Sequence, residues 1–212
     1  MPRRNNIRTR RPKTNGAPTQ PSLRIIGGTW RGRKLDFPTI EGLRPTPDRV
    51  RETLFNWLQA DLPGAQCLDL FTGSGALGLE ALSRGAGAVT FVDRAPEVIS
   101  QLRTNLNLLK AQHAELIAAS ALDWLEQRAI DEEIRYDLVF LDPPFRKGMV
   151  APICTLLEQR NLLQSNALIY VETESELPLD GLPGNWRLHR EKQAGQVAYR
   201  LFLRQPVTDQ AK

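Results

Sequence analysis

Short apolar runs alternate with helical patterns through the middle of the chain, and this alternation limits the fold more than any other feature. The runs are CLDLF (67–71), VTFVD (89–93), ELIAAS (115–120), LVFLD (138–142) and ALIYVE (167–172). Segments whose apolar residues recur at helical spacing follow the first four runs. Repeated strand–helix units predict a parallel sheet with helices on both faces, and so an α/β fold.

The two flanks of this pattern differ from its middle. Residues 186–204, WRLHREKQAGQVAYRLFLR, alternate on both sides of Ala194-Gly195 and predict a closing antiparallel hairpin. Upstream, RPTPDRVRETLFNWLQ (44–59) predicts a helix in which Thr46 caps and Pro47 takes the first helical position. The apolar face of that helix consists of Val50, Leu54, Trp57 and Leu58.

Basic residues concentrate at the start of the chain. Residues 1–34 hold ten Arg or Lys and no acid, which leaves 18 basic and 24 acidic residues for the remainder. We expect residues 1–22 to be a disordered basic leader, because a like-charged segment rich in Pro, Gly and Asn buries little apolar surface. The charge continues into LRIIGGTWRGRKLDF, which alternates like a hairpin. We predict that this hairpin binds nucleic acid through Arg24, Arg31, Arg33 and Lys34.

Length and cysteine content set the organisation of the protein. A chain of 212 residues predicts one main domain. We divide it into the leader 1–22, a hairpin extension 23–43, the main domain 44–205 and a tail 206–212. No apolar stretch approaches the ~20 residues that span a bilayer, so we expect no membrane partner. With only Cys67 and Cys154, neither a disulfide framework nor a cysteine-rich zinc site is expected, which favours a cytoplasmic, metal-free protein.

A glycine motif lies between the first strand and its helix. LDLFTGSGALGLEALSRGA places Gly73, Gly75 and Gly78 in G-x-G-x-x-G spacing, which permits a tight turn, close approach of a ligand and close helix packing. Asp93 ends the next strand, 20 positions after Gly73, where an acid can accept hydrogen bonds from ribose hydroxyls. The pair predicts a nucleoside-bearing cofactor, and NAD is one alternative.

Further acids lie in or after the predicted strands. Asp69 lies inside the first strand and needs a partner, which a cationic ligand could supply. Asp123 is either an early helix residue favoured by the helix dipole or an acceptor for an adenine amino group. Asp142 is followed by Pro143, Pro144 and Phe145. Because ligands bind beyond the carboxyl ends of parallel strands, we expect these strand ends to face one crevice.

Gly73-Ser74-Gly75, Asp93, Asp123 and the sequence DPPF together resemble class I S-adenosylmethionine-dependent methyltransferases that act on amines. More narrowly, RIIGGTWRGRKL, GLRPTPDRVRETLFNWL, CLDLFTGSGALGLEALSRGA and LDPPF are similar to the bacterial ribosomal RNA small-subunit methyltransferase D family, guanine-N2 methyltransferases of 16S rRNA. The resemblance covers most of residues 23–203. It implies a Rossmann-like class I methyltransferase fold: a mostly parallel seven-stranded sheet with a C-terminal antiparallel hairpin and helices on both faces.

The resemblance also implies roles for individual residues. Asp142 would accept one proton of the target amine and help to remove it, the Pro143 carbonyl would accept the other, and Phe145 would stack on the extruded base. The implied S-adenosylmethionine site consists of Arg44, Thr46, Asp69, Phe71, Gly73, Gly75, Asp93, Arg94, Leu122 and Asp123. For Arg44, an ion pair with an acid of the main domain is an equal alternative.

The implied partner is 16S ribosomal RNA or the small ribosomal subunit, including an assembly intermediate, and we expect the protein to be a monomer. An adenine-N6 methyltransferase or a protein glutamine methyltransferase could use the same turn, although the latter would more typically carry Asn at position 142. An NAD-dependent dehydrogenase would leave DPPF unused. A non-catalytic RNA-binding protein of this fold would have no reason to keep every acid that faces the cofactor.

Overall fold

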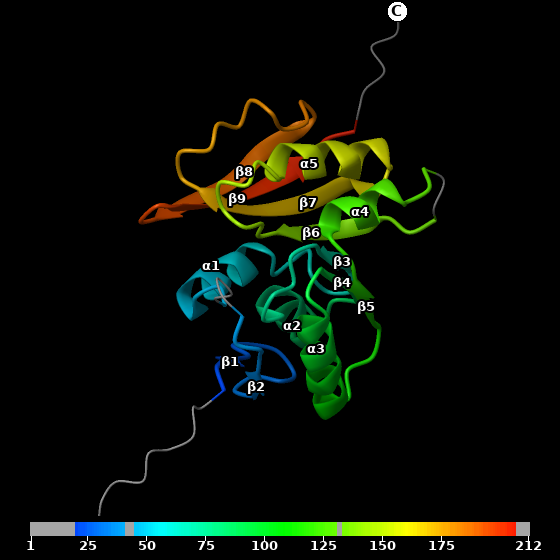
Figure 1. Ribbon diagram of the computed structural model, residues 1–212. Coiled ribbons are helices and arrows are strands. Elements are labelled where there is room, and N and C mark those ends of the chain that lie inside the picture. The colour runs from blue at the N-terminus through cyan, green and yellow to red at the C-terminus, as the bar shows by residue number, and fades with distance from the viewer. Residues whose placement is uncertain (1–19, 41–44, 131–132, 207–212) are drawn as a thin grey trace, which may run out of the picture.

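The computed structural model describes residues 20–40, 45–130 and 133–206 (Figure 1). Its strands are β1 (Ser22–Arg24), β2 (Lys34–Asp36), β3 (Gln66–Asp69), β4 (Ala88–Asp93), β5 (Ala114–Ala118), β6 (Tyr136–Leu141), β7 (Leu163–Glu174), β8 (Trp186–Ala194) and β9 (Val197–Arg204). Its helices are α1 (Asp48–Trp57), α2 (Ala76–Ser83), α3 (Pro96–Leu109), α4 (Ala121–Glu126) and α5 (Val150–Gln159). The predicted strand–helix alternation is confirmed.

Seven strands form one sheet in the order β5-β4-β3-β6-β7-β9-β8. The pairs β3–β4, β4–β5, β3–β6 and β6–β7 are parallel, whereas β9 is antiparallel to both β7 and β8. The chain builds outward from β3 through β4 to β5 and then crosses to the other side of β3 to form β6. This reversal creates a switch point between β3 and β6, the place where open α/β sheets bind ligands.

Helices cover both faces of the sheet. On one face, α1, α2 and α3 pack their apolar sides on β3, β4 and β6, with Leu54, Leu79 and Leu106 among the buried residues. On the other face, α4 and α5 contribute Trp124, Ile153 and other residues to a second buried cluster. Both faces are therefore apolar, as the near-continuous apolar strands predicted. No helix in the described part of the chain is long and apolar enough to span a membrane.

The predicted N-terminal hairpin is present as a separate two-stranded sheet. Strands β1 and β2 pair antiparallel, with Leu23 opposite Leu35. Both of these side chains are buried in the same cluster as α1, α2 and α3, and Figure 1 shows the hairpin beside these helices, away from α4 and α5. The division into a hairpin extension, residues 23–43, and a main domain, residues 44–205, stays a prediction.

One local prediction about α1 is wrong. Pro47 takes the N-cap position of this helix, which begins at Asp48, and no side chain caps the helix. Thr46 is instead buried, and its carbonyl accepts a hydrogen bond from Arg51 Nε at 3.2 Å. Thr46 therefore interacts with Arg51 through its backbone carbonyl, and its side chain does not cap the helix.

Candidate active site

The carboxyl ends of three neighbouring strands bring the predicted site residues to one edge of the sheet. Asp69 of β3 lies opposite Phe91 of β4 and Phe140 of β6. The glycine turn follows β3, Asp93 ends β4 and Asp142 follows β6. The register places these three strand ends side by side at the switch point of the sheet. That they face one crevice stays a prediction.

The glycine turn has the two structural properties that its spacing predicts. Gly75 has φ +79° and immediately precedes α2, so this tight strand-to-helix turn uses the left-handed region that favours glycine. A Cβ atom at Gly78 would lie 2.2 Å from the ring of Phe91. The third glycine therefore allows α2 to pack directly on β4, which positions the helix N-terminus at the sheet edge.

Asp93 fixes the turn from the neighbouring strand. Its Oδ2 accepts a hydrogen bond from the Gly73 N–H at 2.8 Å, and its Oδ1 accepts one from the Ala95 N–H at 2.9 Å. The side chain is half-buried. A carboxylate oxygen can accept two hydrogen bonds, and each oxygen of Asp93 accepts one here, so the group keeps acceptor capacity for a ligand. Its contact with ribose hydroxyls stays a prediction.

Asp69 lies beneath the same turn and has a partner in the protein itself. It is 2% exposed, and its Oδ2 accepts a hydrogen bond from the Gly78 N–H at 3.1 Å. Burial raises the pKa of this carboxyl to about 7. Asp69 therefore has its hydrogen-bond partner in the backbone of α2. Its buried position beneath the glycine turn favours a role in supporting that turn.

The DPPF turn presents a carboxyl group and a ring at the end of β6. Asp142 is half-buried, Pro143 is buried and Phe145 is 38% exposed. Burial, together with the charges of Glu172 and Asp69, raises the pKa of Asp142 well above its ordinary value. A carboxylate with a raised pKa is a stronger proton acceptor, which suits a group that receives a proton from an amine.

A further acid, not predicted from the sequence, lies beside Asp142. Leu141 pairs with Val171, so Glu172 of β7 lies next to Asp142 across the sheet. Glu172 is buried, its Oε2 accepts a hydrogen bond from the Tyr170 hydroxyl at 3.1 Å, and burial raises its pKa to about 7. ALIYVE ends in an acid just as VTFVD and LVFLD do, and this was the signal that pointed to Glu172.

The remaining predicted cofactor residues differ in exposure. Phe71 and Leu122 are half-buried, whereas Arg94 and Asp123 are exposed. Asp123 lies in the first turn of α4, where its N–H donates to the Ser120 hydroxyl at 3.2 Å. Arg44 lies outside the described residues. The cofactor roles of this group stay predictions.

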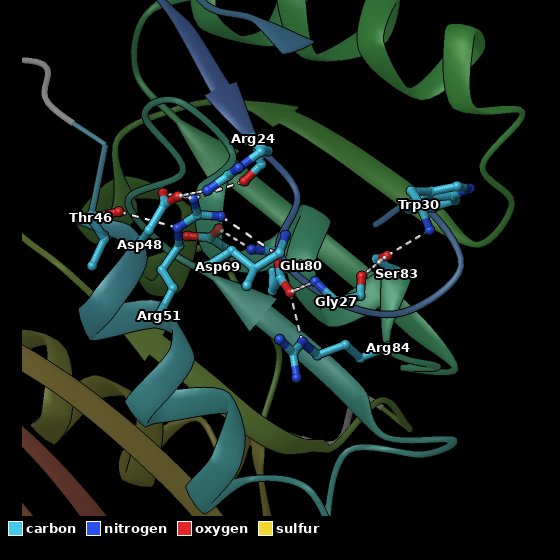
Figure 2. A network of polar contacts seen from close by, with 12 residues as sticks. Arg24, Gly27, Trp30, Thr46, Asp48, Arg51, Asp69, Glu80, Ser83 and Arg84 are labelled. Carbon is cyan, nitrogen blue, oxygen red and sulfur yellow. Dashed lines mark hydrogen bonds and ion pairs between the residues drawn. The ribbon is translucent and has the colours of Figure 1, made fainter. Parts of the chain in front are cut away.

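The basic hairpin is anchored by a buried polar network (Figure 2). Glu80 of α2 is fully buried and accepts hydrogen bonds from the N–H groups of Ile26 and Gly27 at 2.8 and 2.7 Å. It also pairs with Arg84 at 2.6 Å and with the buried Arg51 at 3.5 Å. This single carboxylate therefore joins the hairpin to α1 and α2.

The four predicted RNA-binding residues are all exposed on this anchored hairpin: Arg24, Arg31, Arg33 and Lys34. Arg24 pairs with Asp48 of α1 at 3.0 Å.

Across residues 20–40, 45–130 and 133–206, no group of three or more His, Cys, Asp or Glu is arranged to hold a metal ion.

Comparisons with known proteins identify the family. The model of a family described as Conserved hypothetical protein 95 matches residues 23–203. The chain is 54% identical over 183 residues to ribosomal RNA small subunit methyltransferase D of Escherichia coli, which covers 86% of this chain and 90% of the relative. The chain belongs to the ribosomal RNA small subunit methyltransferase D family. The family member of that name from Haemophilus influenzae is 51% identical, with 85% of this chain and 93% of the relative covered.

Solved structures share the fold of this chain. The Escherichia coli protein yhhF is 50% identical and superposes with a TM-score of 0.79, covering 87% of this chain and 99% of that chain. A structure from Streptococcus mutans, described as a SAM-dependent methyltransferase, is only 18% identical but has a TM-score of 0.66, covering 89% of this chain and 56% of that chain. The Rossmann-like methyltransferase fold implied by the resemblance is confirmed.

Proposed function

We propose that the protein transfers a methyl group from S-adenosylmethionine to the exocyclic N2 amine of a guanine in 16S ribosomal RNA. The observation that carries this proposal is the half-buried Asp142, held in DPPF at the switch point of a methyltransferase fold. The relatives that share more than half of its sequence are named as small-subunit ribosomal RNA methyltransferases.

The residues of the turn suit methylation of an amine. The lone pair of an exocyclic amine is delocalised into the base, so its nitrogen needs acceptors for both protons before it becomes nucleophilic. The Asp142 carboxylate accepts a hydrogen bond from one N–H of the amine and takes up that proton when the nitrogen is methylated. The Pro143 carbonyl accepts a hydrogen bond from the other N–H, whose proton stays on the nitrogen, and the stiff proline ring keeps this carbonyl fixed. Phe145 stacks on the base, and most of the acceleration comes from alignment.

The residues around the glycine turn fit the cofactor. S-adenosylmethionine, when bound, supplies an electrophilic methyl group on a sulfonium centre. The turn through Gly73 and Gly75 would receive its methionine part, Asp93 has acceptor capacity for its ribose hydroxyls, and the exposed Asp123 suits its adenine amino group. Thr46, Phe71, Arg94 and Leu122 would complete this cofactor site.

The hairpin suits a nucleic-acid substrate. Its exposed cations attract phosphates, and Glu80 holds the backbone that carries them. We infer that Arg24, Arg31, Arg33 and Lys34 position the ribosomal RNA, or the small subunit that contains it. The protein would do this as a cytoplasmic monomer.

The decisive experiment offers radiolabelled S-adenosylmethionine and the purified protein separately to small ribosomal subunits, naked 16S rRNA and duplex DNA. Nucleoside mass spectrometry then identifies the product. N2-methylguanosine from subunits or rRNA is the expected result. Methyladenine, or transfer to protein glutamine, would overturn the assignment of the acceptor while keeping the chemistry of the turn.

A further inference from the structure

A recess lies on the α1 side of the sheet and has no role in the site described above. It has a volume of about 250 Å³ and opens between α1 and the tip of the β8–β9 hairpin. Two cations, one threonine and three aromatic residues contribute to its walls: Arg49, Lys192, Thr53, Trp57, Tyr170 and Tyr199.

The sheet register places this recess next to the catalytic turn. Tyr170 lies opposite Phe140, two residues before Asp142, which corresponds to ~7 Å along a strand. Tyr170 also donates its hydroxyl proton to Glu172, the acid beside Asp142. Among the described residues, neither Asp142 nor the rest of DPPF lines the recess. The two sites are therefore neighbours, separated by a buried Tyr–Glu pair.

The chemistry of the walls matches a nucleotide. Trp57 is half-buried and offers part of its ring for stacking, the sequence-tolerant contact by which proteins hold single-stranded bases. Arg49 and Lys192 are exposed at the rim on opposite walls, and Lys192 Nζ lies 3.5 Å from Thr53 Oγ1. The volume is just below the ~300 Å³ at which pockets for larger ligands begin, and so suits one base.

We propose that this recess binds one unpaired nucleotide of the substrate RNA, next to the guanine that is methylated. The base stacks on Trp57, and the two rim cations contact the flanking phosphates. The inference rests on the proposed function, because it takes the occupant from the RNA strand that enters the catalytic turn. In this case α1 and the β8–β9 hairpin help to select the guanine that is methylated.

The first test removes the two cations. We expect Arg49→Ala and Lys192→Ala, combined, to raise KM for small ribosomal subunits roughly tenfold and to lower the salt dependence of RNA binding by about one unit of log–log slope per cation. The affinity for S-adenosylmethionine should not change. The matched control is Arg103→Ala, on the exposed side of α3. A double variant that behaves like this control overturns the proposal.

The second test maps the occupant directly. The wild-type protein is cross-linked with short-wave ultraviolet light to small subunits, and the linked peptides and nucleotides are identified by mass spectrometry. Trp57, Tyr199 or Lys192 should be linked to a nucleotide adjacent to the methylated guanine. Links from these residues to remote nucleotides or to a ribosomal protein, or no link from them, contradict the assignment.

The two proposals fail in different ways. If the wild-type protein methylates no ribosomal RNA, the proposed function is wrong and the inference is overturned with it. If it methylates ribosomal RNA but the double variant matches Arg103→Ala, only the inference about the recess is wrong.

Discussion

Replacing Glu80 with Ala tests whether one buried carboxylate holds the RNA-binding hairpin in place. The side chain is fully buried and receives Ile26 N–H and Gly27 N–H at 2.8 and 2.7 Å, in addition to its pairs with Arg51 and Arg84. Among the residues that the structure describes, its removal leaves the buried guanidinium of Arg51 with Asp48, 2.6 Å away, as its one acidic partner.

The size of the effect follows from this geometry. Removing one partner of a buried ion pair costs about 3 to 5 kcal/mol, and the remaining pair with Asp48 favours the lower end. We therefore expect Glu80→Ala to lower the free energy of unfolding by ~3 kcal/mol, which corresponds to roughly 6 to 12 °C in Tm for a domain of this size. Glu80→Gln keeps one acceptor oxygen and should lose less.

Urea unfolding at neutral pH is the assay, with Glu52→Ala as the control. Glu52 is exposed on α1, so this change should stay within ~0.5 kcal/mol. In conditions where Glu80→Ala is folded, it should also raise KM for ribosomal RNA more than it weakens S-adenosylmethionine binding. A loss below ~1 kcal/mol, or equal effects on both ligands, would refute the reasoning.

Four further outcomes are expected. Asp142→Ala should lower kcat by ~10²-fold or more while S-adenosylmethionine still binds in calorimetry; unchanged turnover would remove its proposed role. Because burial raises the pKa of Asp69 from 3.8 to about 7, its folded form holds a proton that the unfolded form loses, so stability falls from about pH 4 to pH 7. Asp69→Asn should flatten this pH dependence in urea titrations, and an identical slope would contradict the assignment. Gly78→Ala, whose new Cβ would overlap an aromatic ring at 2.2 Å, should cost about 1 to 3 kcal/mol in the same assay, whereas Gly184→Ala has open space and serves as the control. Deleting residues 1–22 should weaken RNA binding and reduce its dependence on salt concentration. If the slope of affinity against salt concentration is unaltered, residues 1–22 do not contact the RNA.

Residues marked by a local sequence pattern could be predicted, whereas residues whose role depends on contacts across the fold could not. Asp93 and Asp142 were predicted from their place at strand ends, because the end of an apolar run is visible in the sequence. Glu172 followed the same rule but had no motif around it and was missed. Glu80 lies in GLEALS, where nothing marks it as buried, and only the docked hairpin encloses it.

The sequence alone determined the alternation of strands and helices, the glycine turn and the acids at strand ends, because each depends on residues close together in the chain. Tertiary structure decided that β6 lies beside β3 and so brings Asp142 to the glycine turn. It also decided that Glu80 meets Arg51 and that α1 and the β8–β9 hairpin enclose a recess. These contacts join residues that are far apart in sequence, and the packing of apolar faces against the sheet selects them rather than any local pattern.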